Sequence, residues 1–299
     1  MFQSNKLSLI LWLSLVTGMN LACQRFVDLQ PNAEPLMAIT SFVQAEDSVV
    51  QVEVYRQQVV GQTGGLDYRD FILTDAKVVV SNLTQDESVE LAYDPEPGRY
   101  LAAVDAGWLR AQDQLSLHVA HPEYPAAKAT CVIPSAPQGL SVRLDSVLED
   151  WPLIDYFTQV SWQDDPQEDN FYRLIGKVKY APNSFSSDPW FFRWEGLEAN
   201  ADYFTDEGRQ GERLQSTRGN LQAVARQING IRPPRQPGDS LLIQLLNIDV
   251  NYYEYMLDLR EARFADETFS EPYQIYSNLE GGVGVFAAYH SVGFKARIK

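Results

Sequence analysis

The chain has 299 residues and carries 24 lysine and arginine residues against 40 aspartate and glutamate residues, which gives a net charge of −16. A field of that sign repels nucleic acid and anionic lipid surfaces, so it argues against a protein that binds either of them electrostatically. With only two cysteines the chain is not a disulfide-stapled scaffold, and at this length an ordinary core suffices.

The N-terminus predicts export. Lys6 supplies a positive charge, and the mostly apolar stretch 7–16 follows it. As a helix this stretch would be about 15 Å long, roughly half the hydrocarbon thickness of a bilayer, which suits a signal peptide rather than a membrane span. No later stretch approaches about twenty apolar residues, so we expect no transmembrane helix in the mature chain.

Cys23 is the predicted lipid anchor. It directly follows the small residue Ala22, as in the lipobox of bacterial lipoproteins, so we expect residues 1–22 to be removed and Cys23 to be acylated. Several acyl chains on one cysteine would hold the protein on a membrane essentially irreversibly. The alternative is an ordinary secretory signal followed by a chance cysteine. Residues 23–35 then form a short lipidated tether.

Period-two alternation of apolar and polar residues dominates from residue 36 onward, as at 50–54 and 115–119. Such alternation is typical of strands with one buried and one wet face. Turn signals at 61–65 and 94–98 separate the runs. Short strands at this spacing predict an immunoglobulin-like β-sandwich over residues 36–135. Cys131 is expected to be a small buried residue of one strand.

A linker with two prolines and a glycine, at 133–139, predicts a boundary. The second predicted domain, 140–299, is β-rich, with an apolar central strand at 241–248 and a long last strand at 286–298. One helix is expected at 249–264, with Asp249 or Asn247 as its N-cap. Its core face carries residues at helical spacing, namely Tyr252, Tyr255, Met256 and Leu259. The predicted fold class is therefore mainly β with one packed helix.

Motifs of catalysis are weak in this chain. His118 and His121 are three residues apart, a spacing that points them to opposite faces of a strand, and His290 is expected to be buried. The glycines of 281–284 follow Glu280, which would repel a phosphate, so a glycine-rich bulge before the last strand is the preferred interpretation. The sequence assigns no catalytic residue, no metal and no cofactor.

The densest acidic stretch spans residues 164–170. It lacks the glycine and the final glutamate of an EF-hand loop, so a solvated turn is the preferred interpretation over a calcium site. Two of its acids, Asp164 and Glu168, would be the catalytic carboxylates of a hydrolase if they faced each other across a cleft.

An aromatic cluster is the candidate binding patch. Within one strand Trp190, Phe192 and Trp194 would share a face. If that face is exposed it is a binding surface, because aromatic residues are favoured at interfaces; if it is buried, it belongs to the core.

Several stretches together resemble a known family. The tail 269–286 reads FSEPYQIYSNLEGGVGVF, and 251–255 reads NYYEY; Asp-Pro at 165–166 precedes Asn-Phe-Tyr at 170–172, and Gly-Arg-Tyr occupies 98–100. In this order the stretches resemble domain-of-unknown-function family 4249, lipoproteins of Bacteroidota. The resemblance implies an outer-membrane lipoprotein, often encoded beside TonB-dependent receptors, and it assigns no catalytic or binding residue.

From these observations we expect a non-enzymatic lipoprotein, anchored in the outer membrane, with the cell surface favoured over the periplasmic face. It would be an accessory or ligand-capture subunit of a TonB-dependent uptake system, with a TonB-dependent receptor as partner and no nucleic acid. The alternatives are a surface hydrolase of glycan or peptide and a structural or adhesive surface lipoprotein.

Overall fold

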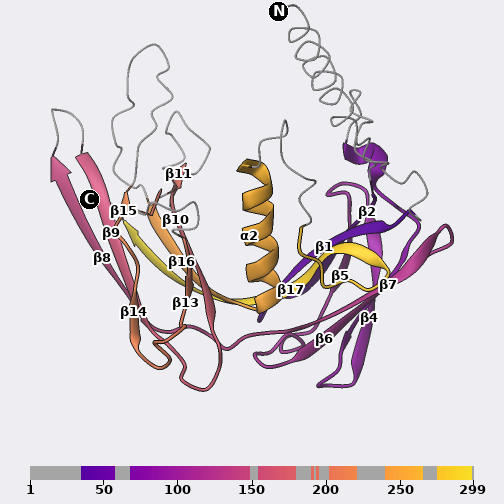
Figure 1. Ribbon diagram of the computed structural model, residues 1–299, viewed down its shortest axis with the longest axis horizontal. Helices are drawn as coiled ribbons and strands as arrows, with labels where there is room; N and C mark the ends of the chain where they lie inside the picture. The colour runs from indigo at the N-terminus through magenta and orange to yellow at the C-terminus, as the bar shows by residue number, and fades with distance from the viewer. Residues whose placement is uncertain are drawn as a thin grey trace, which may run out of the picture. The chain divides into compact units, whose positions relative to one another are not determined.

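The computed structural model describes residues 35–57, 68–148, 154–179, 190–191, 193–194, 202–220, 240–264 and 275–297. Within these ranges the chain is mainly β with one packed α-helix, as predicted (Figure 1). The elements in chain order are β1 (Met37–Gln44), β2 (Val49–Arg56), η1 (Tyr68–Phe71), β3 (Lys77–Asn82), β4 (Glu87–Asp94), β5 (Arg99–Ala103), β6 (Gln114–His121), β7 (Tyr124–Val132), β8 (Gln138–Leu148), β9 (Ile154–Gln163), β10 (Phe171–Lys179), β11 (Trp190–Phe191), β12 (Arg193–Trp194), β13 (Tyr203–Thr205), β14 (Arg213–Gln215), β15 (Gly219–Asn220), β16 (Ser240–Ile248), α2 (Val250–Phe264) and β17 (Gly282–Arg297).

The first seven strands follow the predicted alternation. They are hydrogen-bonded in the order β1-β2-β5-β4-β3-β6-β7, with every neighbouring pair antiparallel. Every second side chain points into a first core, as Val50, Val52 and Val54 of β2 do. Cys131 is 3% exposed in that core, as expected. The turn predicted at 94–98 joins β4 to β5, whereas the one at 61–65 lies outside the described residues.

The last strand completes this first layer of strands. β17 runs parallel to β1, from Met37 opposite Gly282 to Gln44 opposite Tyr289. On the far side, Lys128 of β7 exchanges two backbone hydrogen bonds with Glu280, at 2.9 and 2.8 Å. The strand order that starts at β17 and ends at β7 is therefore joined back, through Lys128 and Glu280, to the residues just before β17. A core built mainly from residues 37–133 thus also contains Leu279, Phe286 and Ala288.

Glycines permit this close approach. Gly281 and Gly284 have φ angles of +75° and +114°, a region that favours glycine. A β-carbon at Gly281 would collide with the carbonyl oxygen of Ala126, and one at Gly284 with the carbonyl oxygen of Ile39. The 281–284 segment is therefore a backbone contact point at the start of β17, which pairs with β1 in an unbroken register from Gly282 onward rather than through a bulge.

The C-terminal half of β17 belongs to a second core. It pairs with β16, which pairs with β10 on its other side, so the apolar run 241–248 is the predicted central strand. A separate sheet contains β9, flanked by β8 on one side and by β14 and β15 on the other. The apolar faces of the two sheets meet around Trp162, which is fully buried and packs edge-on against Tyr172 and Phe204.

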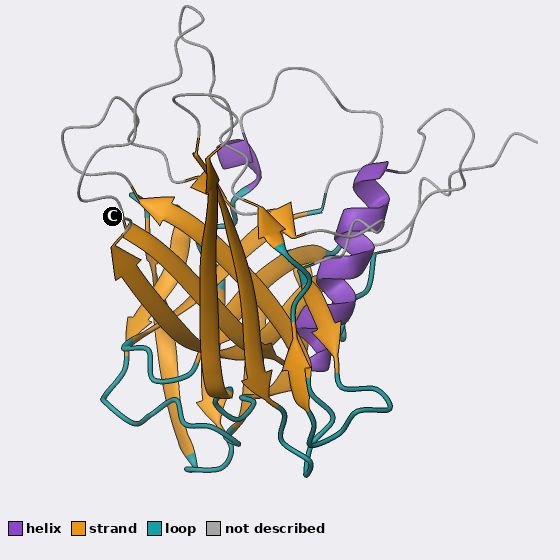
Figure 2. Ribbon diagram, turned by 90° about the vertical axis from the view of Figure 1, so that its left-hand side faces the viewer, coloured by secondary structure: helices purple, strands orange, loops and turns teal. Residues whose placement is uncertain are grey.

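Helix α2 covers the central strands (Figures 1 and 2). Asp249 is its N-cap, since Asp249 Oδ1 accepts the backbone N–H of Tyr252 at 2.8 Å. Tyr252 is buried, with Tyr255 and Met256 packed beside it, so the predicted tyrosine stripe is core. In the described part of the chain no helix has the length and apolar character needed to cross a bilayer.

The helix changes the environment of β17 in a way that its alternation did not predict. Phe286 and Ala288 face the first core, while Val285 and Ala287 face α2 in a third core. The strand is therefore buried on both faces at this point, because a helix packs on the face expected to be wet.

Both predicted domains lie within one compact unit, Leu36–Lys299. The linker residues Ile133, Pro134 and Pro137 are buried. The division at 135–140 stays a prediction about independent folding. Residues 1–34, with the signal peptide, Cys23 and the tether, lie outside the described residues.

Candidate functional site

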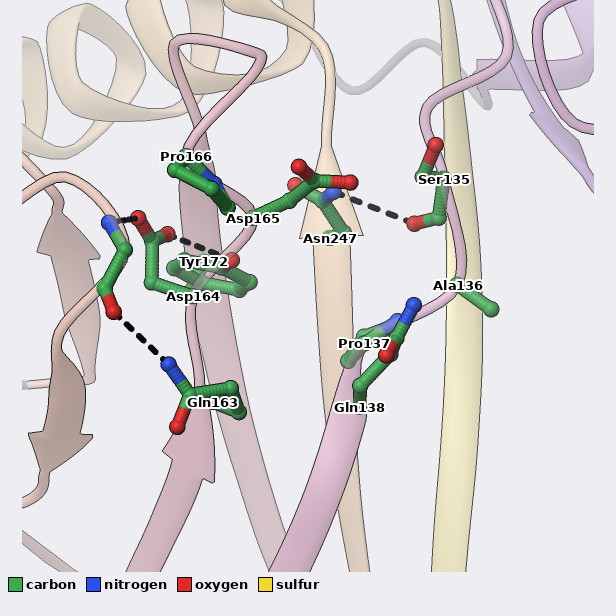
Figure 3. A pocket seen from close by; sticks show the side chains of 11 residues that line it. Ser135, Ala136, Pro137, Gln138, Gln163, Asp164, Asp165, Pro166, Tyr172 and Asn247 are labelled. Carbon is green, nitrogen blue, oxygen red and sulfur yellow. Dashed lines mark hydrogen bonds between the residues drawn. The ribbon is translucent and has the colours of Figure 1, made fainter.

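A pocket of about 260 Å³ lies where β8 begins, β9 ends and β16 ends (Figure 3). The predicted acidic turn and the predicted linker form opposite walls of this pocket. Its lining residues are Ser135, Ala136, Pro137, Gln138, Gln163, Asp164, Asp165, Pro166, Tyr172, Gly211 and Asn247. The structure thus places two stretches singled out in the sequence next to each other.

Asp164 anchors the acidic turn to its surroundings. Its side chain is 2% exposed, and each carboxylate oxygen accepts one hydrogen bond: from the Tyr172 hydroxyl at 2.8 Å and from the Gly211 N–H at 2.7 Å. Burial and the neighbouring Asp164 carboxylate raise the pKa of Tyr172, so its hydroxyl stays protonated and keeps donating. Asp164 therefore acts as a fixed structural acceptor rather than as part of a solvated turn.

Asn170 closes the same turn. Its side-chain amide donates to the carbonyl oxygens of Asp165 and Glu168, at 3.1 and 2.9 Å, and its N–H donates to Asp206 Oδ2 at 2.9 Å. The Asn247 amide then donates to Asn170 Oδ1 at 2.8 Å and to the Ser135 carbonyl at 3.1 Å. Buried polar groups need such partners, so this network fixes the floor of the pocket.

Glu168, the second acid of the hydrolase hypothesis, points to the other side of the linker. Its Oε1 accepts hydrogen bonds from Ser135 Oγ and from Gln112 Nε2, both at 2.9 Å. Glu168 is not among the residues that line the pocket. The structure therefore brings Asp164 and Glu168 into one turn without placing them across a shared cavity.

The chemistry of the pocket follows from its lining. Two carboxylates, Asp164 and Asp165, line it, and among the described lining residues none is basic. Asp165 Oδ1 accepts the N–H of Gln167 at 3.0 Å, as in an Asx turn. Because Asp164 already accepts a hydrogen bond on each oxygen, Asp165 is the lining carboxylate with capacity left, which suits a small neutral or cationic group that donates hydrogen bonds. Among the described residues, no group of three or more His, Cys, Asp or Glu is placed to hold a metal.

The aromatic candidates divide between two sheets. Trp190 pairs with Val178 of β10, whereas Trp194 pairs with Gly219 of β15. Trp194 is 9% exposed, donates its indole N–H to the Leu174 carbonyl at 3.1 Å and belongs to the second core. Phe192 lies outside the described residues, and a binding role for Trp190 and Phe192 stays a prediction.

Sequence reasoning missed a charged cluster that fixes α2. Arg260 of the helix makes two contacts to Asp202, at 2.8 and 3.2 Å, and Arg173 of β10 donates to the Tyr252 hydroxyl at 2.6 Å. The two guanidinium groups lie 4.8 and 5.2 Å from the ring centre of the buried Tyr203. No local motif announces this cluster, because its members come from three separate elements.

The cap of α2 predicts a pH dependence of stability. Burial raises the pKa of Asp249 to about 7, although its hydrogen bonds to Tyr252 and Asn251 work in the opposite direction. The folded state then holds this proton more tightly than the unfolded chain. The tighter binding of this proton stabilises the folded state fully below about pH 4, and that stabilisation is lost as the pH rises through 7.

Asp249→Asn should remove that dependence, because asparagine still caps the helix but carries no charge. At pH 8 we expect the variant to be more stable than the parent by about 1 kcal/mol, a reduced figure because the carboxylate is partly exposed. Urea unfolding at pH 5 and pH 8 measures this, with the exposed Asp169→Asn as control. Equal pH profiles for parent and Asp249→Asn would contradict the assignment.

The comparison with family models matches residues 25–293 to the family described as Domain of unknown function (DUF4249). A comparison with curated proteins gave no match.

Proposed function

We propose, from the premise that this chain belongs to the DUF4249 family, that it is a non-enzymatic binding subunit of an outer-membrane uptake system. Lipid on Cys23 would hold it on the outer membrane, on the cell surface rather than on the periplasmic face. Its partner would be a TonB-dependent receptor, to which it would deliver or present a nutrient.

The observation that supports a binding role is how the acids Asp164 and Glu168 are hydrogen-bonded and placed. Catalytic carboxylates need an oxygen free for the reacting atoms. Both oxygens of Asp164 are held by protein donors, and Glu168 is not among the residues that line the pocket. A preformed pocket in which Asp164 is committed to the framework on both oxygens, and which Glu168 does not line, favours binding over a hydrolase that uses these two acids.

Co-purification tests the partner. The full-length protein, tagged at its C-terminus and extracted from outer membranes in mild detergent, should bring down a β-barrel receptor. The matched control is Cys23→Ser, which should leave the membrane fraction and lose the receptor together with the lipid. If the acylated protein is isolated without any outer-membrane barrel, the uptake role is wrong, and an unmodified residue 23 in mass spectrometry would remove the anchor.

A further inference from the structure

β8 is an edge strand whose outer side is unpaired by any described strand. In its sheet it pairs with β9 alone, from Gln138 opposite Gln163 to Leu148 opposite Ile154. Figure 1 shows it at the margin of its sheet, and Figure 2 views the molecule from that side. A long free edge offers a row of backbone donors and acceptors to another strand.

Hydrogen bonding within the sheet tells which β8 groups point outward. Val160 of β9 donates its N–H to Ser216 Oγ at 3.0 Å and accepts the Ser216 N–H at 2.8 Å, so its backbone groups face away from β8. Val142, opposite Val160, is then in a non-hydrogen-bonded pair, and its own N–H and C=O point to the free edge. Because the pattern repeats every two residues, those of Leu144 do too.

The inner face of this edge is incompletely covered. Leu140, Val142 and Leu144 point toward the second core, yet all three are only half-buried. The outer face carries Arg143 and Asp145, joined at 3.0 Å, with side chains 75% and 58% exposed. The strand therefore combines open backbone groups, partly exposed apolar side chains and one charge of each sign.

We infer that β8 pairs antiparallel with β8 of a second copy, about a two-fold axis at Leu144. In that register Leu144 exchanges both backbone hydrogen bonds with Leu144 of the partner subunit, as its outward groups require. Arg143 then lies directly opposite Asp145 of the partner subunit, and the symmetry produces this ion pair twice. Non-hydrogen-bonded pairs such as this one hold their side chains closest.

Charge favours this register over the neighbouring one at Val142. An axis at Val142, the preceding outward-pointing residue, would place Arg143 opposite Ser141 and Asp145 opposite Gly139, with no ion pair. The axis at Leu144 also brings the half-buried Leu144 of each copy against the other. The net charge of −16 on each copy opposes association over long range, so the dimer is weak and is favoured when salt screens that repulsion.

Sedimentation velocity tests the proposal on residues 24–299, made without the signal so that no lipid is attached. A monomer–dimer equilibrium with a Kd of about 10–100 µM is expected at about 0.15 M salt, since a single strand pair makes a small interface. Arg143→Asp and Asp145→Arg should each raise that Kd at least about tenfold, because each places like charges opposite one another. The double variant restores opposite charges and should recover the parent Kd.

Lys77→Asp is the matched control, because it changes an exposed lysine to aspartate on β3, away from this edge. Its Kd should stay within about twofold of the parent, after allowance for the added net charge. Hydrogen exchange supplies an independent readout: the amides of Val142 and Leu144 should gain protection with concentration, while that of Arg143, which faces β9, should not. A monomer up to about 0.5 mM, or a double variant no better than the single ones, would overturn the inference.

Discussion

Gly284→Ala is expected to destabilise the protein by about 3–5 kcal/mol, among the largest effects of any single added methyl group in this chain. The φ of Gly284 is +114°, where a side chain is strained, and the new β-carbon would collide with the carbonyl oxygen of Ile39 on β1. That carbonyl belongs to the backbone of a buried strand, so it cannot swing aside as a long side chain would. Relief requires β17 and β1 to separate at their parallel pairing.

Gly293→Ala is the matched control on the same strand. At Gly293 the nearest atom to an added β-carbon is the Ile243 carbonyl oxygen, 3.9 Å away, and the φ angle is ordinary. We expect a change within about 1 kcal/mol, and a gain is as reasonable as a loss. Urea unfolding followed by circular dichroism gives both values. Similar free energies for the two variants would show that β17 does not approach β1 as described.

The strands themselves were predictable because their physics is local. Alternation at 50–54 and 115–119, the apolar run at 241–248, and the spacing of Tyr252 and Met256 depend on which side chains face an apolar environment. Pairing between distant segments leaves no such local pattern. Nothing near residue 37 or residue 282 announces that β1 and β17 run parallel to each other, although the glycines at 281–284 mark a close backbone approach.

The candidate site was predictable only in part, for a related reason. The acids of 164–170 were visible as a cluster, and their number suggested a wet turn. The burial of Asp164 depends on Tyr172 and Gly211, and the floor of the pocket depends on Asn247, far along the chain. A buried aspartate and an exposed one look alike in sequence, because what distinguishes them is the partner that folding brings.

Phe286→Ala tests whether the two predicted domains are one folding unit. Phe286 lies in the C-terminal range, yet its fully buried side chain belongs to the core of β1 to β7. Its backbone is fixed by Asn278, which accepts the Phe286 N–H at 3.0 Å and donates to the Phe286 carbonyl at 2.8 Å. The fixed backbone cannot move in to fill the space left by the deleted ring, so we expect a cavity and a loss of about 3–5 kcal/mol.

The strands in which hydrogen-exchange protection falls show whether residues 36–135 unfold independently of the C-terminal part or together with it. If residues 36–135 fold independently, Phe286→Ala should leave hydrogen-exchange protection in β2 and β6 unchanged and should lower it only in β16 and β17. Because Phe286 packs within the first core, we expect protection to fall in β2 and β6 by the same free energy as in β16.

The control is Phe294→Ala, eight residues further along β17, where a half-buried ring packs on the second core. It should cost about 1–2 kcal/mol, since less apolar surface returns to water. A last strand that belongs to both cores couples them, so damage to either end of β17 should lower protection in the strands around both cores.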